Sequence, residues 1–206
     1  SCLVNPRACY ELDLNIEVSE TKKNIAVIGA GPAGLAAAVT AAQRGHNVSL
    51  FDSAETIGGQ FNLAKRIPGK EEFNETIRYF QRQLEIHNID VKLGQRVTTQ
   101  QLNESNFDEV MIATGIAPRT PEIDGIDHPS VVSYIDVISG KIELGKKVAV
   151  IGAGGIGFDV AEYLSHAGEA SSQNIPAFMK EWGIDMTMES RGGIEGIEAE
   201  GKPSPR

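Results

Sequence analysis

The chain has 206 residues, 41% of them hydrophobic and 23% charged, a composition typical of one or two globular domains with a buried core. Its 28 acidic and 19 basic residues give a formal net charge of -9 without a basic cluster, so nucleic acid is not an expected partner. The longest apolar run, Gly34 to Ala42, is far shorter than the roughly 20 residues of a membrane span. Because the N-terminus also lacks a signal-like pattern, we expect a cytoplasmic protein.

The first 23 residues are predicted to form an arm that leads into the first domain. They show no sustained periodicity and contain Pro6 and several charges. Cys2 and Cys9, the two cysteines of the chain, both lie in this arm. They cannot form a disulfide framework for the fold, and their spacing matches no compact metal site, so from the residues alone both are interpreted as unpaired thiols.

Strands and helices are predicted to alternate after the arm. In chain order, the expected elements are a strand at 24–28, a helix at 34–44, a strand at 47–51, a helix at 71–87 and strands at 90–93 and 107–113. This order is typical of an α/β fold with a parallel sheet. The sequence therefore predicts a Rossmann-like domain over residues 24–120, followed by a turn-rich interdomain connection over 121–145.

A second Rossmann-like unit is predicted to begin at residue 146. A strand at 147–151, a glycine turn at 152–157 and a helix at 158–165 repeat the opening of the first domain. From Gly168 onward the sequence is rich in Gly, Ser, Glu and Pro and contains no run typical of a partner strand. We therefore expect either a long loop, or a second domain over 146–206 that is incomplete within this chain.

The first glycine motif, Gly29, Gly31 and Gly34, has the spacing of a dinucleotide-binding loop between a strand and a helix. The first glycine permits the tight turn, the second lets the backbone approach a pyrophosphate, and the third lets the helix press against the sheet. Amides at the helix N-terminus then face the phosphates. This context indicates a nucleotide site.

An acidic residue and a second glycine turn extend this prediction. Asp52 ends the second strand, where a carboxylate accepts both hydroxyls of an adenosine ribose and repels a 2'-phosphate. The motif therefore favours FAD or NAD over NADP. Gly58, Gly59 and Gln60 follow closely and suit a ligand that extends beyond its adenosine half, which favours FAD. Without the neighbouring motif, Asp52 is a solvated strand end and Gly58-Gly59 a plain loop.

The second glycine motif, Gly152, Gly154 and Gly157, repeats the spacing and predicts a pyridine nucleotide site. The residue that selects NADH or NADPH would end the next strand, which is not visible in the sequence. Asp159 lies just inside the predicted helix, and we interpret it as a helix-capping residue. Since hydrolase, zinc protease and P-loop motifs are absent, the chemistry is expected to come from the cofactors.

Six segments together resemble the bacterial NADPH-dependent 2,4-dienoyl-CoA reductases. They are Cys2–Cys9, Val27–Gly34, Ile57–Asn62, Ile67–Phe73, Ala113–Gly115 with Pro118-Arg119, and Gly152–Asp159. The resemblance extends over nearly the whole chain. It is most specific between Ile57 and Phe73 and least specific after Gly183.

This resemblance implies a fragment of a longer flavoprotein. Members of the family begin with a (β/α)8 barrel that binds FMN, then bind a 4Fe-4S cluster, and then carry FAD and NADPH domains. Electrons pass from NADPH through FAD, the cluster and FMN to a 2,4-dienoyl-CoA of fatty-acid β-oxidation. The resemblance makes Cys2 the last cluster ligand, although one thiolate cannot hold a cluster bound by four. The expected partners are small-molecule cofactors, the FMN barrel and a C-terminal FAD segment, and this chain alone is expected to be inactive.

The resemblance also implies individual FAD contacts. Ala33 would bind through its amide, Asp52 at the ribose, Gln60 and Lys70 at the pyrophosphate and flavin side, and Val97 at the adenine through backbone atoms. Gly59 and Gly115 belong to the same expected site. Lys70 supplies the positive charge that a pyrophosphate favours, whereas without the resemblance it is an exposed lysine.

Two alternatives to this assignment stay open. One is another reductase of the same architecture, similar to trimethylamine dehydrogenase or enoate reductase. The other is a flavin-binding module without catalysis of its own. The sequence of the missing barrel would distinguish a dienoyl-CoA reductase from another reductase of this architecture. A flavin spectrum recorded before and after addition of NADPH would identify a flavin-binding module without catalysis.

Overall fold

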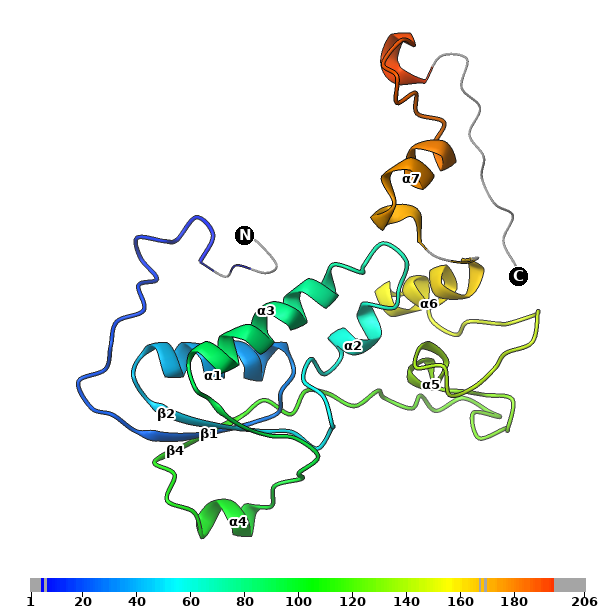
Figure 1. Ribbon diagram of the computed structural model, residues 1–206. Coiled ribbons are helices and arrows are strands. Elements are labelled where there is room, and N and C mark those ends of the chain that lie inside the picture. Colours follow the sequence, from blue (N-terminus) through cyan, green and yellow to red (C-terminus); the bar gives the residue numbers. More distant parts are fainter. Residues whose placement is uncertain (1–4, 6, 167, 169, 195–206) are drawn as a thin grey trace. The chain divides into compact units, whose positions relative to one another are not determined.

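The computed structural model describes residues 5, 7–166, 168 and 170–194, which divide between two compact units. The first contains Ser1–Asn62 and Phe73–Arg119, and the second contains Leu63–Glu72 and Thr120–Arg206. Figure 1 shows the elements of both units along the chain. Cys2 lies outside the described residues. Among the described helices, none has the length and apolar character that crossing a membrane requires.

The first unit is built on a parallel sheet of four strands, β1 (Asn24–Ile28), β2 (Asn47–Phe51), β3 (Asp90–Lys92) and β4 (Glu109–Ile112). Their order in the sheet is β3-β2-β1-β4. In the register, Ile28 at the end of β1 lies opposite Phe51 of β2 and Ile112 of β4. The carboxyl ends of these three strands therefore meet at one edge, where ligands bind in open α/β sheets. The predicted Rossmann-like fold is confirmed.

Two long helices cover one face of this sheet. The chain passes from β1 through α1 (Pro32–Gln43) to β2, and from β2 through α3 (Phe73–Ile86) to β3, moving outward in the same direction each time. Because such crossovers are right-handed, both helices lie on the same side, as Figure 1 shows. The return from β3 to β4 carries the short helix α4 (Thr99–Asn103) to the opposite side.

The core of the first unit lies between the sheet and α1. Its fully buried side chains include Val27 of β1, Leu35 of α1 and Leu50 of β2. α1 is rich in alanine and buries Gly34, Ala38 and Ala41, so it can lie close to the strands. The edge strand β4 is covered less, since Ile112 at its end is 69% exposed.

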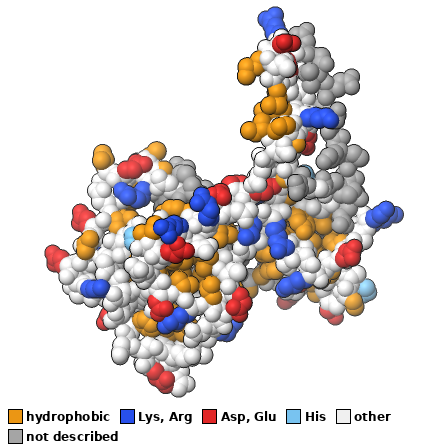
Figure 2. All heavy atoms as spheres, viewed as in Figure 1, with side chains coloured by type: hydrophobic (Ala, Val, Ile, Leu, Met, Phe, Trp, Pro, Cys, Tyr) orange, Lys and Arg blue, Asp and Glu red, His pale blue; other side chains and the backbone are white. Residues whose placement is uncertain are grey.

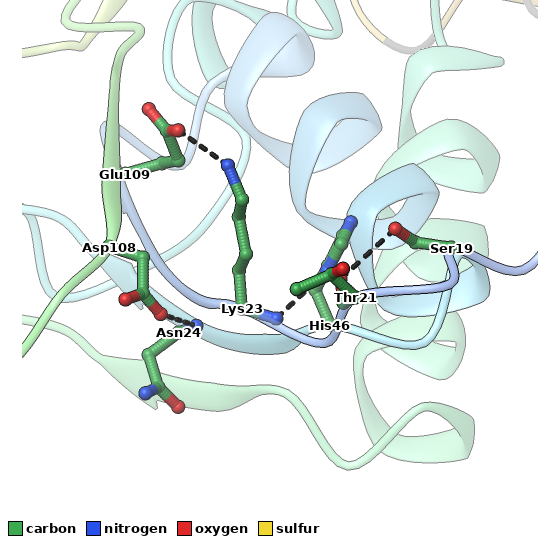
Figure 3. A network of polar contacts seen from close by, with 7 residues as sticks. All are labelled: Ser19, Thr21, Lys23, Asn24, His46, Asp108 and Glu109. Carbon is green, nitrogen blue, oxygen red and sulfur yellow. Dashed lines mark hydrogen bonds and ion pairs between the residues drawn. The ribbon is translucent and has the colours of Figure 1, made fainter.

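The arm is fastened to the amino ends of the strands by a polar network (Figure 3). The Lys23 ammonium forms an ion pair with Glu109 of β4 at 2.7 Å, and the Lys23 amide donates to Nδ1 of His46 at 3.2 Å. The Asn24 amide donates to the Asp108 carboxylate at 2.7 Å. This network lies at the end of the sheet opposite the glycine motif.

The second unit is helical in its described residues. Its elements are α5 (Tyr134–Ile138), α6 (Gly155–Ser165), α7 (Ile175–Glu181) and the 3-10 turns η1 (Ser171–Gln173) and η2 (Arg191–Gly193). Its core brings together Ile67, Val137, Ile138, Val160 and Leu164. Apolar side chains also lie exposed along and after α7, Trp182 and Met188 among them (Figure 2).

The strand predicted at 147–151 is wrong. These residues have no strand structure, and Val148, Val150 and Ile151 are 41%, 40% and 69% exposed. The reason is the absence of partners, since no described residue of the second unit forms a strand to pair with them. The helix that follows does form, and it begins three residues earlier than predicted, at Gly155 instead of Phe158.

Candidate nucleotide-binding sites

The first glycine motif forms a tight loop between β1 and α1. Gly29 has φ +110°, and a Cβ there would overlap the carbonyl group of Ala113. A Cβ on Gly34 would overlap the carbonyl oxygen of Gly29. Gly29 therefore requires glycine because of its positive φ and the nearby carbonyl group of Ala113. Gly34 requires glycine because the helix begins directly against the loop.

The N-terminus of α1 is open to an anion. Its N-cap is Gly31, and no side chain caps the helix. Pro32 occupies the first turn, where the lack of an N–H costs nothing. Ala33 and Gly34 follow, so their amides lie in the turn whose N–H groups have no partner within the helix. Together with the helix dipole, these amides suit a pyrophosphate, and the FAD contact of the Ala33 amide stays a prediction.

The Gly58-Gly59 turn packs against this loop, backbone on backbone. The Gly58 amide donates to the carbonyl oxygen of Ala30 at 2.8 Å. Gly59 has φ +52°, and a Cβ there would lie only 2.9 Å from the Cα of Gly31. The two turns together form a cradle of backbone groups without side chains, whose close contact a Cβ on Gly59 would prevent.

Gln60 and Gly115 are also brought together. The Gln60 side-chain amide lies 3.5 Å from the carbonyl oxygen of Ile116, the residue after Gly115. Gly115 has φ +74° and open space where its Cβ would be. The segment after β4 thus reaches the same edge of the sheet as the turn that follows β2.

Asp52 holds the glycine loop through its carboxylate. One oxygen accepts from the Ala30 amide at 2.6 Å and the other from the Ala54 amide at 2.8 Å. The side chain is therefore not a solvated strand end. A carboxylate has about four lone-pair sites, so acceptor capacity is left for ribose hydroxyls. The sequence indicated the ribose role but not the contact with Ala30, which depends on the turn between β1 and α1.

Val97 lines a cavity of about 330 Å³ in the first unit. Phe51, Lys92 and Phe107 form other parts of its wall. Phe107 packs edge-on against Phe51 with 6.1 Å between ring centroids, and the Lys92 ammonium lies 5.1 Å above the Phe51 ring. The predicted adenine contact of Val97 therefore lies beside a wall made of aromatic rings and a lysine. Phe51 of this wall is the last residue of β2 and directly precedes Asp52.

Lys70 belongs to the second unit, unlike the other residues expected at FAD. Its ammonium binds both carboxylate oxygens of Asp159, at 2.6 and 2.7 Å. The capping role predicted for Asp159 is wrong, because α6 has Gly154 as its N-cap and no side-chain cap bond. Nothing in the sequence signalled this pair, since its members are 89 residues apart.

The second glycine motif repeats the local geometry of the first. Gly152 has φ +119°, Gly154 is the N-cap of α6, and a Cβ on Gly157 would overlap the carbonyl oxygen of Gly152. A Cβ on Gly152 or Gly154, however, would meet nothing within 4 Å. The loop has the shape of a dinucleotide site, and its surroundings in the described residues are open.

Among the described residues, no group of three His, Cys, Asp or Glu side chains could hold a metal ion. Cys9 is an exposed free thiol. The metal-ligand role predicted for Cys2 falls outside the described residues.

The sequence of this chain matches a known family model over residues 23–190, a range that includes both glycine motifs. The model describes the pyridine nucleotide-disulphide oxidoreductases. This chain belongs to that family. Its members are enzymes that use FAD and a pyridine nucleotide, so the two glycine loops fit the two cofactors of the pyridine nucleotide-disulphide oxidoreductases.

Several larger proteins are similar to this member of the family. A bilirubin reductase of Mediterraneibacter gnavus is 35% identical over 82% of the chain, and an NADH oxidase of Thermoanaerobacter brockii is 34% identical over 92%. A 2-naphthoyl-CoA reductase, solved with 2-naphthoyl-CoA, is 38% identical over 80% of the chain with a TM-score of 0.77. The chain spans only 26%, 30% and 25% of these three proteins, respectively.

Proposed function

We propose that this chain is the FAD-binding portion, with the opening of the NADPH-binding portion, of a larger reductase that acts on a 2,4-dienoyl-CoA. The observation that carries the cofactor part of the proposal is the cradle at the carboxyl ends of the strands. There the uncapped N-terminus of α1 lies beside the close approach of Gly31 and Gly59. The Gly58 amide donates to the Ala30 carbonyl oxygen, and the Ala30 amide donates to the Asp52 carboxylate.

In this assignment FAD is held by the first unit through backbone and carboxylate groups. The first-turn amides of α1, including that of Ala33, donate to the pyrophosphate. The Asp52 carboxylate accepts from the ribose, and backbone atoms near Val97 meet the adenine. Gly59 lets the second turn pack against Gly31 of the glycine loop, and Gln60 and Gly115 lie at the same edge of the sheet. FAD supplies the step between a hydride donor and later electron acceptors.

The second glycine loop is proposed as the site of the hydride donor. The uncapped N-terminus of α6 provides amides for a pyrophosphate, as α1 does. NADPH is the donor that the resemblance implies, and the NADH oxidase among the relatives makes NADH the competitor to test.

The substrate class rests on the resemblance and on one relative. The 2-naphthoyl-CoA reductase acts on a conjugated acyl group carried by coenzyme A, which is the chemical class of a dienoyl-CoA. Since the chain spans about a quarter of that protein, the substrate site, the 4Fe-4S cluster and the FMN barrel are proposed for the rest of the polypeptide. The exposed side chains of β4 support further polypeptide over this strand, because parallel sheets are ordinarily covered on both faces.

The test begins with the purified chain and FAD. We expect the chain to retain FAD through gel filtration and to show a bound-flavin spectrum. Anaerobic addition of NADPH should then bleach the flavin absorbance, and NADH should do so more slowly. A chain that retains no FAD would contradict the first site, and bound FAD that neither nucleotide bleaches would contradict the donor site.

A second measurement addresses the substrate. The chain alone is expected to reduce no 2,4-dienoyl-CoA, because the substrate site is proposed to lie outside it. The same chain joined to its flanking reading frame should turn the substrate over with NADPH. Turnover by the chain alone would show that the substrate site does not lie outside it.

A further inference from the structure

The segment Leu63–Glu72 lies in the sequence between two parts of the first unit, yet it is built into the second. Ile67 is 2% exposed and joins the core of the second unit with Val160 and Leu164 of α6. The Arg66 guanidinium donates to the carbonyl oxygen of Ile138 at 3.0 Å. Packing and hydrogen bonding therefore tie this segment to α5 and α6.

The contact of Lys70 with Asp159 is the strongest polar link between the segment and α6. The ammonium binds both carboxylate oxygens at 2.6 and 2.7 Å, and the two side chains are 38% and 33% exposed. Charge-assisted contacts of this length are stronger than neutral hydrogen bonds. Partial exposure weakens the pair relative to a buried one but leaves both charges in place.

The position of Asp159 makes its charge relevant to the second glycine loop. Asp159 lies in the second turn of α6, five residues after the N-cap Gly154, which is roughly 7.5 Å along the helix axis. A carboxylate at this distance opposes a pyrophosphate bound at the helix N-terminus. The ammonium of Lys70 neutralises this charge by binding both carboxylate oxygens.

We propose that Lys70 is a positioning residue for the second nucleotide loop, acting through Asp159. Lys70 neutralises the acidic side chain of α6, and the segment around Ile67 braces the helix, so that its N-terminal amides are available to a pyridine dinucleotide. The inference rests on the proposed donor site. It assigns Lys70 to that site instead of to the pyrophosphate of FAD.

The experiment is a double-mutant cycle on the full chain loaded with FAD. The variants are Lys70→Met, Asp159→Asn and the two combined, and the readout is the Kd for NADPH and for NADH at low and high salt. Lys70→Met should weaken nucleotide binding about three- to tenfold at low salt, because it leaves an uncompensated carboxylate near the phosphates. Asp159→Asn alone should have little effect, and the double variant should restore the affinity to within about twofold.

Two further measurements separate charge from packing. High salt should reduce the loss in Lys70→Met, since partly exposed charges are screened. Lys70→Arg keeps the charge and should keep the affinity. The matched control is Lys23→Met, which breaks an ion pair of the same chemistry and length in the first unit and should leave the nucleotide Kd unchanged.

Each contrary outcome is distinct. If Lys70→Met weakens nucleotide binding and the double variant does not recover the affinity, the inference is wrong. It is also wrong if Lys70→Met weakens FAD binding and leaves the nucleotide affinity unchanged, a result that would place Lys70 at FAD. A wild-type chain that binds neither NADPH nor NADH would overturn the proposed donor site together with this inference. Thermal unfolding of each variant shows whether the fold is retained.

Discussion

The two glycine loops of this chain share a motif and a local shape but differ in their surroundings. In both, the third glycine lies directly against the carbonyl oxygen of the first, at Gly34 and Gly29 and again at Gly157 and Gly152. Around the first loop, Ala113, Asp52 and Gly59 approach the backbone. Around the second, the space beside Gly152 and Gly154 is open.

The glycine motif forms the turn and the start of the helix, whereas a complete binding site also needs residues from other parts of the chain. The turn and the helix that follows it form in both units, since they depend only on residues close in sequence. The proposed ribose acceptor, the second glycine turn and the strand beside the loop come from residues far along the chain. A glycine motif thus predicts a helix N-terminus that can receive a phosphate, and the neighbouring strands complete the binding site.

The largest expected difference between the loops comes from alanine at their first glycine. Gly29→Ala and Gly152→Ala place a side chain at nearly the same positive φ, but only the first also overlaps the carbonyl of Ala113. We expect Gly29→Ala to destabilise the chain by about 4 kcal/mol and Gly152→Ala by about 1 to 2 kcal/mol. Chemical denaturation of the two variants measures both values. Equal losses would show that the surroundings of the first loop contribute nothing.

The next effect concerns the carboxylate that only the first loop has. Asp52→Ala removes the acceptor of the Ala30 and Ala54 amides and the proposed ribose acceptor. We expect FAD binding to weaken by about 1.5 to 3 kcal/mol, measured by flavin titration.

The control for this variant is Asp108→Ala. Asp108 also accepts a backbone amide, that of Asn24, but at the opposite end of the sheet (Figure 3). Its replacement should leave the affinity for FAD unchanged. Unchanged affinity in Asp52→Ala as well would refute the ribose assignment.

The smallest effect concerns Asp185, a carboxylate of the second unit. The Thr187 hydroxyl, followed by the amides of Ser190 and Thr187, lowers the pKa of Asp185 well below its ordinary value of 3.8. Because these contacts favour the ionised form, their stabilising contribution is present above that ordinary value and is lost as the pH falls through the lowered pKa. We expect carboxyl NMR to show late protonation of Asp185 in an acid titration.

Thr187→Val tests the cause of this shift. It removes the hydroxyl that donates at 2.6 Å and should move the pKa of Asp185 back toward 3.8, while the remaining amide contacts keep it partly lowered. An unchanged titration would mean that the turn after α7 is held by the amides alone.

Local patterns predicted the elements of the first unit closely. The strands β1 and β2 have the predicted bounds, and α3 lies within its predicted range. The helices α2 (Phe61–Ala64), α4, α5 and α7 were not predicted, although α4 carries a capping box between Thr98 and Gln101 that the sequence could have revealed. Such short helices have weak periodicity, and their signal lies in the capping residues.

The sequence by itself determined the alternation of strands and helices, both glycine turns and the acidic residue after β2, because each depends on side-chain periodicity, on positive φ or on a short fixed spacing. Only the tertiary structure decided that residues 147–151 form no strand, since a strand exists only with a partner. It also decided that Asp52 holds the glycine loop and that Lys70 pairs with Asp159 in the second unit. Contacts between residues far apart in sequence leave no local pattern, so they emerge only once the chain has folded.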